Sequence, residues 1–157
     1  MKGKPEVIAA LSENLKEELT AINQYMIHTE MCENWGYERL KKQNRERSVV
    51  EMKHAEKIVE RILFLDGMPK MDELGKISIG TNVSQQLKND LALEKDAVET
   101  YNRSIETCRK VGDNATADFF TGILKQEEGH VDELETELGL IEQMGLQNYL
   151  TQQLNKE

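Results

Sequence analysis

The sequence predicts an all-α protein, built as a four-helix bundle with one long connection and a short fifth helix at the C-terminus. Three observations predict this fold. The chain has 157 residues, the size of one ordinary domain, so we treat residues 1–157 as a single domain. Only two prolines interrupt it, and apolar residues recur every three or four positions over long stretches. Leu, Glu, Lys and Gln, which favour helices, are abundant.

The first two helices form the first predicted hairpin. One helix spans about residues 5–34, begins at Pro5, where a first helical turn tolerates proline, and ends before Gly36. The next spans about residues 37–65 and closes at Gly67, a glycine C-cap with proline two residues beyond. The joint between them is short, so the two helices should run antiparallel.

A long connection follows the first hairpin. Residues 66–82 contain three glycines and a proline, show no helical period, and can span about 55 Å when extended. The long helices should each measure roughly 40 Å, so the connection can travel their full length and leave the second and third helices parallel. This topology is typical of ferritin-like folds.

The remaining helices are placed by their caps. The third spans about residues 83–111 after Asn82, and the fourth spans about residues 114–138 after a cap at Asp113 or Asn114. Gly139 marks the expected end of the fourth helix. A short fifth helix is predicted over about residues 146–154.

An internal repeat is the most informative feature of the sequence. Residues of the first hairpin recur 76 positions later in the second (94 − 18 = 76), and three potential metal ligands in each half obey this offset. The matched pairs are Leu11/Leu87, Glu18/Glu94, Ala21/Ala97, Tyr25/Tyr101, Glu51/Glu127 and His54/His130. The two hairpins are therefore expected to be copies of one unit.

Four of the repeated residues are glutamates on helix faces that should be buried. Glu18 shares a stripe with Leu15 and Ile22, and Glu94 shares one with Leu91 and Val98. Four ionised carboxylates in a core would cost more than the stability of a domain unless cations offset them. Two divalent cations would balance the four negative charges.

Two E-x-x-H segments supply the histidines. Residues at i and i+3 project on the same side of a helix, so each segment can present an oxygen and a nitrogen to one metal. Mostly carboxylate ligation with one histidine per metal suits iron or manganese better than structural zinc. We therefore predict a dinuclear centre with the ligands Glu18, Glu51, His54, Glu94, Glu127 and His130.

Beyond these ligands, the chain resembles the bacterioferritin family over nearly its whole length. The resemblance includes LTAINQY (19–25), VEMKHAEKIVERILFLDGMP (50–69) and LALEKD (91–96). It implies a 24-subunit iron-storage cage built from two-fold dimers, with a ferroxidase centre in each bundle that oxidises Fe²⁺ with O₂ or H₂O₂. It also implies haem between paired subunits and a small ferredoxin as a partner for iron release.

Met52 matches the position that holds the haem iron in this family. It lies about 100° around the helix from Glu51, so it must face away from the metal centre. It joins Val59 and Leu63 in a second apolar stripe, which predicts a subunit interface. The resemblance implies that Met52 is an axial haem ligand, one from each subunit of a pair. The alternative is that Met52 only packs in the interface.

Tyr25 is expected to support the centre without binding metal. It lies two turns from Glu18, Tyr101 has the equivalent place beside Glu94, and a buried tyrosine hydroxyl normally finds a polar partner such as a metal-site carboxylate. A redox role for Tyr25 is the alternative. His28 lies about 80° off the face of Glu18 and is expected at the surface or in an interface.

Three residues depart from the family pattern. Arg45 and Glu46 stand where many bacterioferritins have an aromatic residue and a histidine, and Val50 stands where they have an aspartate. In the family, that histidine and aspartate can hold iron on the inner surface of the cage. The auxiliary site is therefore in doubt for this chain.

Composition excludes several other classes. The net charge of −9 disfavours nucleic acid, no apolar run is long enough to span a membrane, and no secretory signal is visible, so we expect a cytoplasmic protein. Cys32 and Cys108 form no C-x-x-C pair, which argues against a rubredoxin-type iron site. Two alternatives to ferroxidase activity with iron storage stay open: a peroxide-reducing di-iron or di-manganese enzyme, and a non-enzymatic haem-binding bundle.

Overall fold

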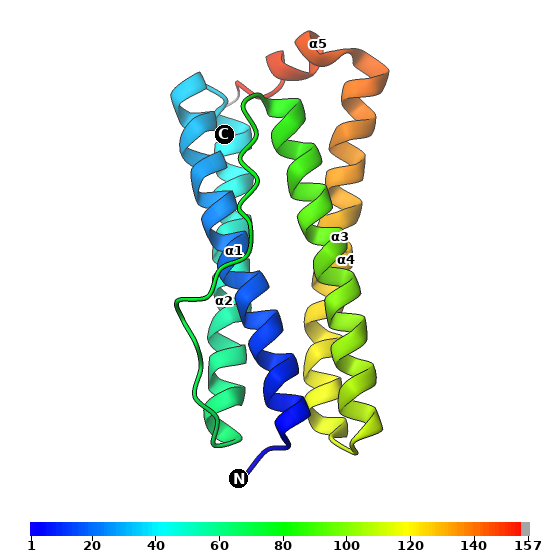
Figure 1. Cartoon of the computed structure of the whole chain (residues 1–157). Coiled ribbons are helices and arrows are strands. Elements are labelled where there is room, and N and C mark those ends of the chain that lie inside the picture. Colours follow the sequence, from blue (N-terminus) through cyan, green and yellow to red (C-terminus); the bar gives the residue numbers. More distant parts are fainter. Residues whose placement is uncertain (155–157) are drawn as a thin grey trace.

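The computed structural model describes residues 1–154 and confirms the predicted all-α fold (Figure 1). The last three residues of the predicted domain, 155–157, lie outside the described residues. Four long helices are followed by a short one: α1 (Pro5–Trp35), α2 (Glu38–Phe64), α3 (Val83–Lys110), α4 (Asn114–Met144) and α5 (Leu146–Thr151).

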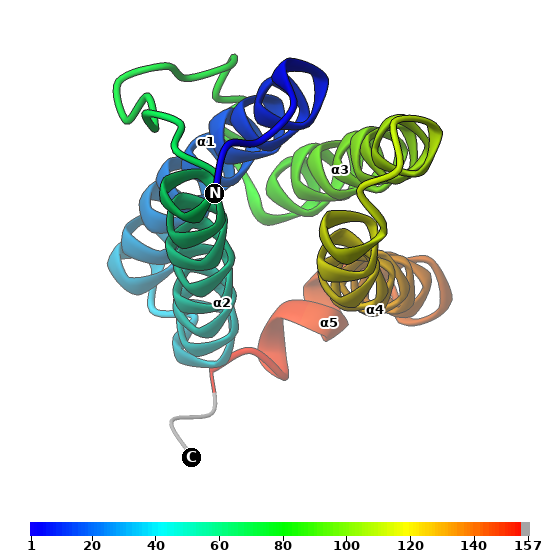
Figure 2. The ribbon, with the colours of Figure 1, turned by 90° about the horizontal axis from the view of Figure 1, so that it is seen from below.

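The long helices form a bundle of two antiparallel hairpins. Helix α1 packs on α2, α3 packs on α4, and α1 also packs on α3, as the view along the bundle in Figure 2 shows. The connection from α2 to α3 runs beside α1 from one end of the bundle to the other (Figure 1). Helices α2 and α3 therefore run parallel, as the sequence predicts. None of the helices in residues 1–154 is long and apolar enough to cross a membrane.

The connection forms no helix or strand, and side chains of α1 serve as hydrogen-bond partners for its backbone. Three α1 side chains, spaced four residues apart, accept backbone N–H groups of the connection. The bonds are Gly75 N to Thr20 Oγ1 at 2.8 Å, Ser78 N to Gln24 Oε1 at 3.1 Å and Gly80 N to His28 Nε2 at 3.0 Å. Buried backbone groups need such partners, so these bonds fix the path of the connection along α1.

Two apolar clusters fill the bundle on either side of its middle. Burial of one large apolar side chain contributes about 2 kcal/mol, so these clusters supply most of the driving force for folding. One cluster includes Leu11, Leu15, Ile58, Ile62 and Phe120, and the other includes Cys32, Leu40, Leu87, Leu134 and Tyr149. The predicted ligands come from the helix segments between the two clusters.

Helix α4 is longer than predicted. It continues to Met144, six residues beyond the expected end at 138 (144 − 138 = 6). Gly139 does not end the helix, because Leu138 and Ile141 keep packing on the core around it. The residue with a positive φ is Gly145, at 81°, and the helix stops there.

Helix α5 is shorter than predicted, and ends at Thr151. The chain then turns onto the start of α2, where the backbone N–H of Arg39 donates to the carbonyl of Gln153 at 3.0 Å. The Arg39 guanidinium also donates to Oε1 of Gln153 at 2.8 Å. These bonds replace the last helical turn that the sequence predicted.

The end of α2 also differs from the glycine C-cap that the sequence predicted at Gly67. The left-handed residue is Asp66, with φ of 59°, and not Gly67. Aspartate tolerates this conformation better than most side chains. Gly67 is needed for space, since a Cβ atom there would lie 2.9 Å from Cγ2 of Ile62. The predicted caps of α3 and α4 are present, with the side chains of Asn82 and Asp113 accepting backbone N–H groups.

Candidate metal centre

The four long helices each direct one glutamate into the middle of the bundle. The E-x-x-H spacing places a histidine beside the glutamate on α2 and on α4, because residues three apart share a helix side. All six side chains predicted as ligands are buried: Glu18, Glu51, His54, Glu94, Glu127 and His130. The structure thus brings together residues that are up to 112 positions apart in the sequence (130 − 18 = 112).

The six side chains form two overlapping groups. In each group, one potential ligand atom per residue lies within 4.8 Å of the others. Glu51 and Glu127 belong to both groups, so each can bridge two metal ions. The first group is Glu18, Glu51, His54 and Glu127, and the second is Glu51, Glu94, Glu127 and His130. This arrangement has the form of a dinuclear site with two bridging and two terminal carboxylates.

The Nδ1 atoms of both histidines face the carboxylates. Nδ1 of His54 lies 2.9 Å from Oε1 of Glu127 and 3.3 Å from Oε2 of Glu51. Nδ1 of His130 lies 3.0 Å from Oε1 of Glu51. On the opposite side of its ring, Nε2 of His54 is 2.5 Å from Oε1 of Gln126. Because that Nε2 donates its proton to Gln126, Nδ1 is the nitrogen left to bind a metal.

Several atoms in the cluster have no hydrogen-bond partner despite their burial. Native proteins rarely leave buried polar atoms in this state, and the close approaches between these atoms lack hydrogen-bonding geometry. The unpartnered atoms of the cluster are Glu18 Oε2, Glu51 Oε1, His54 Nδ1, Glu127 Oε1 and His130 Nδ1. A pair of divalent cations would satisfy all five, and this donor set of oxygens and imidazole nitrogens suits iron or manganese.

The carboxylates and histidines strongly perturb each other's protonation. Burial and the nearby Glu51 raise the pKa of Glu18 well above its ordinary value. Burial raises the pKa of Glu94 to about 7, and Glu127 adds to the shift. Burial lowers the pKa of His130, but the surrounding carboxylates outweigh this and raise it to about 11. Protons therefore occupy the metal-free centre near pH 7, and a metal ion must displace them.

Two tyrosines hold the terminal glutamates from across the bundle. The hydroxyl of Tyr25 donates to Oε1 of Glu94 at 2.7 Å, and the hydroxyl of Tyr101 donates to Oε1 of Glu18 at 2.5 Å. Sequence reasoning expected a metal-site carboxylate as partner, but placed each tyrosine beside the glutamate of its own helix. The bonds run crosswise and tie α1 to α3 at the centre.

Sequence reasoning missed three polar residues around the centre. Gln126, which orients His54, gave no signal, because it is an exposed residue next to a ligand. Arg47 lies one helical turn before Glu51, a spacing that could have revealed it. Its guanidinium carbon is 5.6 Å from the centre of the Tyr25 ring. Glu133, on α4, pairs with Arg47 at the surface.

A larger cavity lies beside the centre, between α1, α3 and the connection. Its volume is about 430 Å³, and its lining includes Glu17 and Ser78. Glu17 also lines a much smaller cavity, of about 10 Å³, together with four of the ligands. Thr100 donates to Oε1 of Glu17 at 2.6 Å. Burial raises the pKa of Glu17 to about 7.

The expectation for His28 was wrong. The side chain is fully buried, with Nδ1 2.9 Å from Oδ1 of Asp90 and Nε2 accepting the backbone N–H of Gly80. Gln24 donates to the same Asp90 oxygen at 2.8 Å. Residues 78–80 cover this face of α1, and the angle from Glu18 on a lone helix could not reveal that cover.

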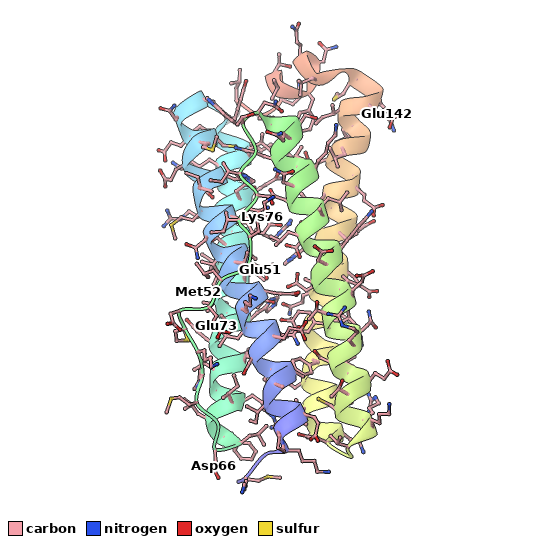
Figure 3. The ribbon with its side chains drawn as sticks, viewed as in Figure 1. Glu51, Met52, Asp66, Glu73, Lys76 and Glu142 are labelled. Carbon is pink, nitrogen blue, oxygen red and sulfur yellow. The ribbon has the colours of Figure 1, made fainter. Side chains whose placement is uncertain are left out.

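Met52 faces away from the centre. It is 45% exposed, whereas Glu51 is buried, and Figure 3 labels both residues on α2. Val49 and Leu63 are exposed apolar residues on the same side of α2 as Met52, and Met26 is an exposed apolar residue of α1. Exposed apolar residues that gather on one side of a helix are typical of an interaction surface. We call Met26, Val49, Met52 and Leu63 the Met52 face.

The residues that depart from the family pattern lie outside the ligand cluster. Arg45 and Glu46 are exposed, and Val50 is half-buried. Of the three, only Glu46 offers a carboxylate. One carboxylate makes a weak iron site, so the auxiliary site expected of the family gains no support here.

Comparisons with known proteins cover almost the whole chain. Residues 8–144 match the family of ferritin-like domains. The chain is 44% identical to a bacterioferritin of Brucella melitensis over 149 residues, which covers 95% of this chain and 92% of the relative. It is 43% identical to a bacterioferritin of Mycolicibacterium paratuberculosis over 152 residues, covering 97% and 96%. A bacterioferritin of Rhodobacter capsulatus is 42% identical over 149 residues, covering 95% and 92%.

Proposed function

Because the chain belongs to the bacterioferritin family of iron-storage proteins, we propose that it oxidises Fe²⁺ to Fe³⁺ at the buried centre and stores the ferric product as a mineral. Two Fe²⁺ ions are the substrate. Glu51 and Glu127 bridge them, Glu18 with His54 completes one position, and Glu94 with His130 completes the other. The four negative carboxylates offset the four positive charges of the two ions, which lowers the free-energy cost of burying the ions.

The centre favours oxidation because it holds two one-electron donors close together. Each Fe²⁺ gives one electron to O₂ or H₂O₂, so the pair delivers two electrons without releasing a one-electron oxygen radical. The protein fixes the two ions and leaves coordination positions open for the oxidant. Gln126, Tyr25 and Tyr101 orient the ligands, which reduces the rearrangement needed when iron binds.

The buried set of unpartnered ligand atoms carries this proposal. Rapid mixing of metal-free protein with Fe²⁺ and O₂ tests it. We expect Glu127→Ala and His54→Ala to slow the initial oxidation by about 100-fold or more. The matched control is Glu128→Ala, since Glu128 is the exposed neighbour of Glu127 and should keep the full rate. An unchanged initial rate in either ligand variant would disprove the centre.

We also propose that Met52 holds haem at a two-fold subunit interface, one methionine from each subunit. The exposed thioether and the apolar Met52 face support this role, because methionine is an established axial haem ligand. Bound haem would supply a path for electrons. Met52→Leu should lose the haem absorption spectrum and keep the initial rate of Fe²⁺ oxidation. Unchanged haem content would show that Met52 only packs in the interface.

The family resemblance further leads us to propose a homo-oligomeric cage of 24 subunits in the cytoplasm, with a small ferredoxin as the reductant for iron release. Cys32 and Cys108 are buried and unpaired, which suits a reducing compartment. Solution mass, together with iron and haem content per subunit on one preparation, tests the cage. A mass of only one or two subunits would contradict it.

A further inference from the structure

The two histidines of the centre are held differently on the side of the ring that faces away from the carboxylates. Nε2 of His54 lies 2.5 Å from Oε1 of Gln126, an exposed residue of α4. Within residues 1–154, Nε2 of His130 has no such partner, and the side chain of His130 is 11% exposed against 4% for His54. The hydrogen bond between His54 and Gln126 therefore has no counterpart at His130.

The internal repeat explains the missing bond. The repeat relates His54 to His130, and it relates Gln126 to Val50 (126 − 76 = 50). Val50 comes directly before a bridging glutamate on α2, as Gln126 does on α4. The side chain of valine has no hydrogen-bonding group. Position 50 therefore cannot hold the ring of His130 in the way that position 126 holds the ring of His54.

The inner nitrogens of the two rings, in contrast, follow the repeat closely. Nδ1 of His54 lies 2.9 Å from Oε1 of Glu127, and Nδ1 of His130 lies 3.0 Å from Oε1 of Glu51. The two terminal glutamates also match, since each accepts one tyrosine hydroxyl. The contact of Gln126 with His54 is thus a difference between two metal positions that otherwise have equivalent ligands.

A hydrogen bond at the outer nitrogen prepares an imidazole for metal binding. A neutral imidazole carries one proton, and a partner that accepts this proton at Nε2 leaves the lone pair of Nδ1 free for a metal. The same bond fixes the orientation of the ring and raises the basicity of the ligating nitrogen. Loss of such a bond lowers metal affinity by about 10- to 100-fold. His54 has this support from Gln126, and His130 lacks it.

We propose that Gln126 is a positioning residue for His54 and that it makes the two metal positions unequal. This inference rests on the proposed dinuclear centre and concerns the order in which the centre fills. The position of Glu18 and His54 binds the first metal ion. The position of Glu94 and His130 binds the second ion more weakly, and this ion is the more easily exchanged of the two.

The charge of Arg47 acts in the same direction. Its guanidinium carbon lies 5.6 Å from the centre of the Tyr25 ring, and the hydroxyl of Tyr25 donates to Glu94. A positive charge on this side opposes the binding of a cation at the Glu94 position. Glu133 offsets Arg47 only in part, because this carboxylate is largely exposed. All variants proposed below keep Arg47, so a change between them reports on positions 50 and 126.

The test exchanges the same two side chains at the two repeat-related positions of the full-length protein. Gln126→Val removes the acceptor from His54, and Val50→Gln supplies one to His130. Gln126→Glu keeps an acceptor and is the conservative control. Crystals of each metal-free protein are equilibrated with limiting Zn²⁺, and anomalous scattering gives the occupancy of each metal position. Titration with Zn²⁺ in solution gives the two dissociation constants.

In the unmodified protein, we expect the Glu18–His54 position to fill first, with an affinity about tenfold or more above that of the other position. Gln126→Val should lower the affinity of this position by about 10- to 100-fold and leave the Glu94–His130 position unchanged. Val50→Gln should raise the affinity of the Glu94–His130 position by about tenfold or more. Gln126→Glu should keep the filling order of the unmodified protein.

The outcomes separate failure of this inference from failure of the proposed function. If the unmodified protein does not bind two Zn²⁺ ions at the six ligands, the proposed centre fails. If it binds two but fills both positions equally, the centre stands and the inference is wrong. Unequal filling that neither Gln126→Val nor Val50→Gln changes would show that Gln126 is not the cause. Equal loss of affinity at both positions in Gln126→Val would contradict the positioning of His54 alone.

Discussion

The α1–α2 hairpin and the α3–α4 hairpin are alike inside the bundle and different outside it. Inside, the small central cavity is lined by Glu18, Ala21 and Glu51 and by their counterparts 76 positions later. The hydrogen bonds Tyr25–Glu94 and Tyr101–Glu18 are also related by the offset of 76 positions. The exception is Glu17, whose counterpart, Leu93, lines the same cavity without a charge.

Outside, the same repeat positions carry different chemistry. Met52 corresponds to Glu128, Leu19 to Lys95, and Val59 to Glu135. The charged set lines a surface hollow of about 450 Å³ between α3 and α4. Inside, the matched carboxylates of the two halves meet in one cluster. Outside, Met52 is an exposed apolar residue, whereas the equivalent residue of the other hairpin, Glu128, is charged.

The largest expected effect tests whether the two halves contribute equally to the centre. Glu18→Ala and Glu94→Ala remove equivalent terminal ligands, so each should slow initial Fe²⁺ oxidation by about 100-fold or more. Stopped-flow absorbance would measure both rates. A loss confined to one variant would show that a single metal position performs the oxidation and would break the equivalence of the halves.

The second prediction tests the difference between the outer faces. Met52→Glu places a charge in the expected interface, where an unpaired buried charge costs about 3–5 kcal/mol. We expect smaller assemblies in sedimentation at a concentration where the unmodified protein is fully assembled. Glu128→Gln, at the equivalent position of the other hairpin, should leave the assembly unchanged. Equal effects would contradict the assignment of the interface to the Met52 face.

The third prediction concerns protons at the two terminal glutamates. Burial raises the pKa of Glu94 to about 7, so below pH 7 its carboxyl holds a proton that a metal must displace, and burial shifts the pKa of Glu18 in the same direction. Metal affinity should therefore rise with pH, by about tenfold per pH unit for each proton displaced. Titration with Zn²⁺, which does not change oxidation state, should give weaker binding at pH 6 than at pH 8. Equal Zn²⁺ affinity at pH 6 and pH 8 would contradict the raised pKa values of Glu18 and Glu94.

The sequence predicted which side chains meet at the centre of the bundle better than it predicted their hydrogen-bond partners. The positions of Glu18 and Glu94 follow from helix periodicity, because spacing along a helix decides which face a residue occupies. The partners of Tyr25 and Tyr101 depend on distances across the bundle, which spacing along one helix does not contain. The ligand assignment itself remains a prediction until metal binding is measured.

The ends of elements were harder to predict than their existence. Gly139 looked like a helix end, but continued packing of Ile141 carries α4 onward to Gly145. His28 looked like a surface residue because the prediction treated α1 as covered on one side only. The connection, which has no periodic pattern, covers the second side. The wrong prediction for His28 therefore came from an irregular segment, whose path the sequence pattern does not show.

The smallest expected effect compares two buried polar pairs that the repeat relates. His28 and Asp90 correspond to Ser104 and Asn14, and Nδ2 of Asn14 donates to Oγ of Ser104 at 2.6 Å. His28→Ala leaves Asp90 and the N–H of Gly80 short of partners, which should cost about 1–3 kcal/mol. Ser104→Ala should cost only about 0.5–1.5 kcal/mol, because Asn14 keeps its bond to the carbonyl of its own helix.

Amide hydrogen exchange measures this difference locally. In His28→Ala, the amides of residues 75–80 should exchange faster, because the connection loses one of the three bonds that hold it to α1. In Ser104→Ala, the same amides should keep their protection, since the Asn14–Ser104 bond joins α1 to α3 without the connection. Equal loss of protection in both variants would mean that the connection is held by the bundle as a whole. Loss of protection only in His28→Ala would show that the His28–Asp90 pair anchors the connection, whereas the equivalent Asn14–Ser104 pair does not.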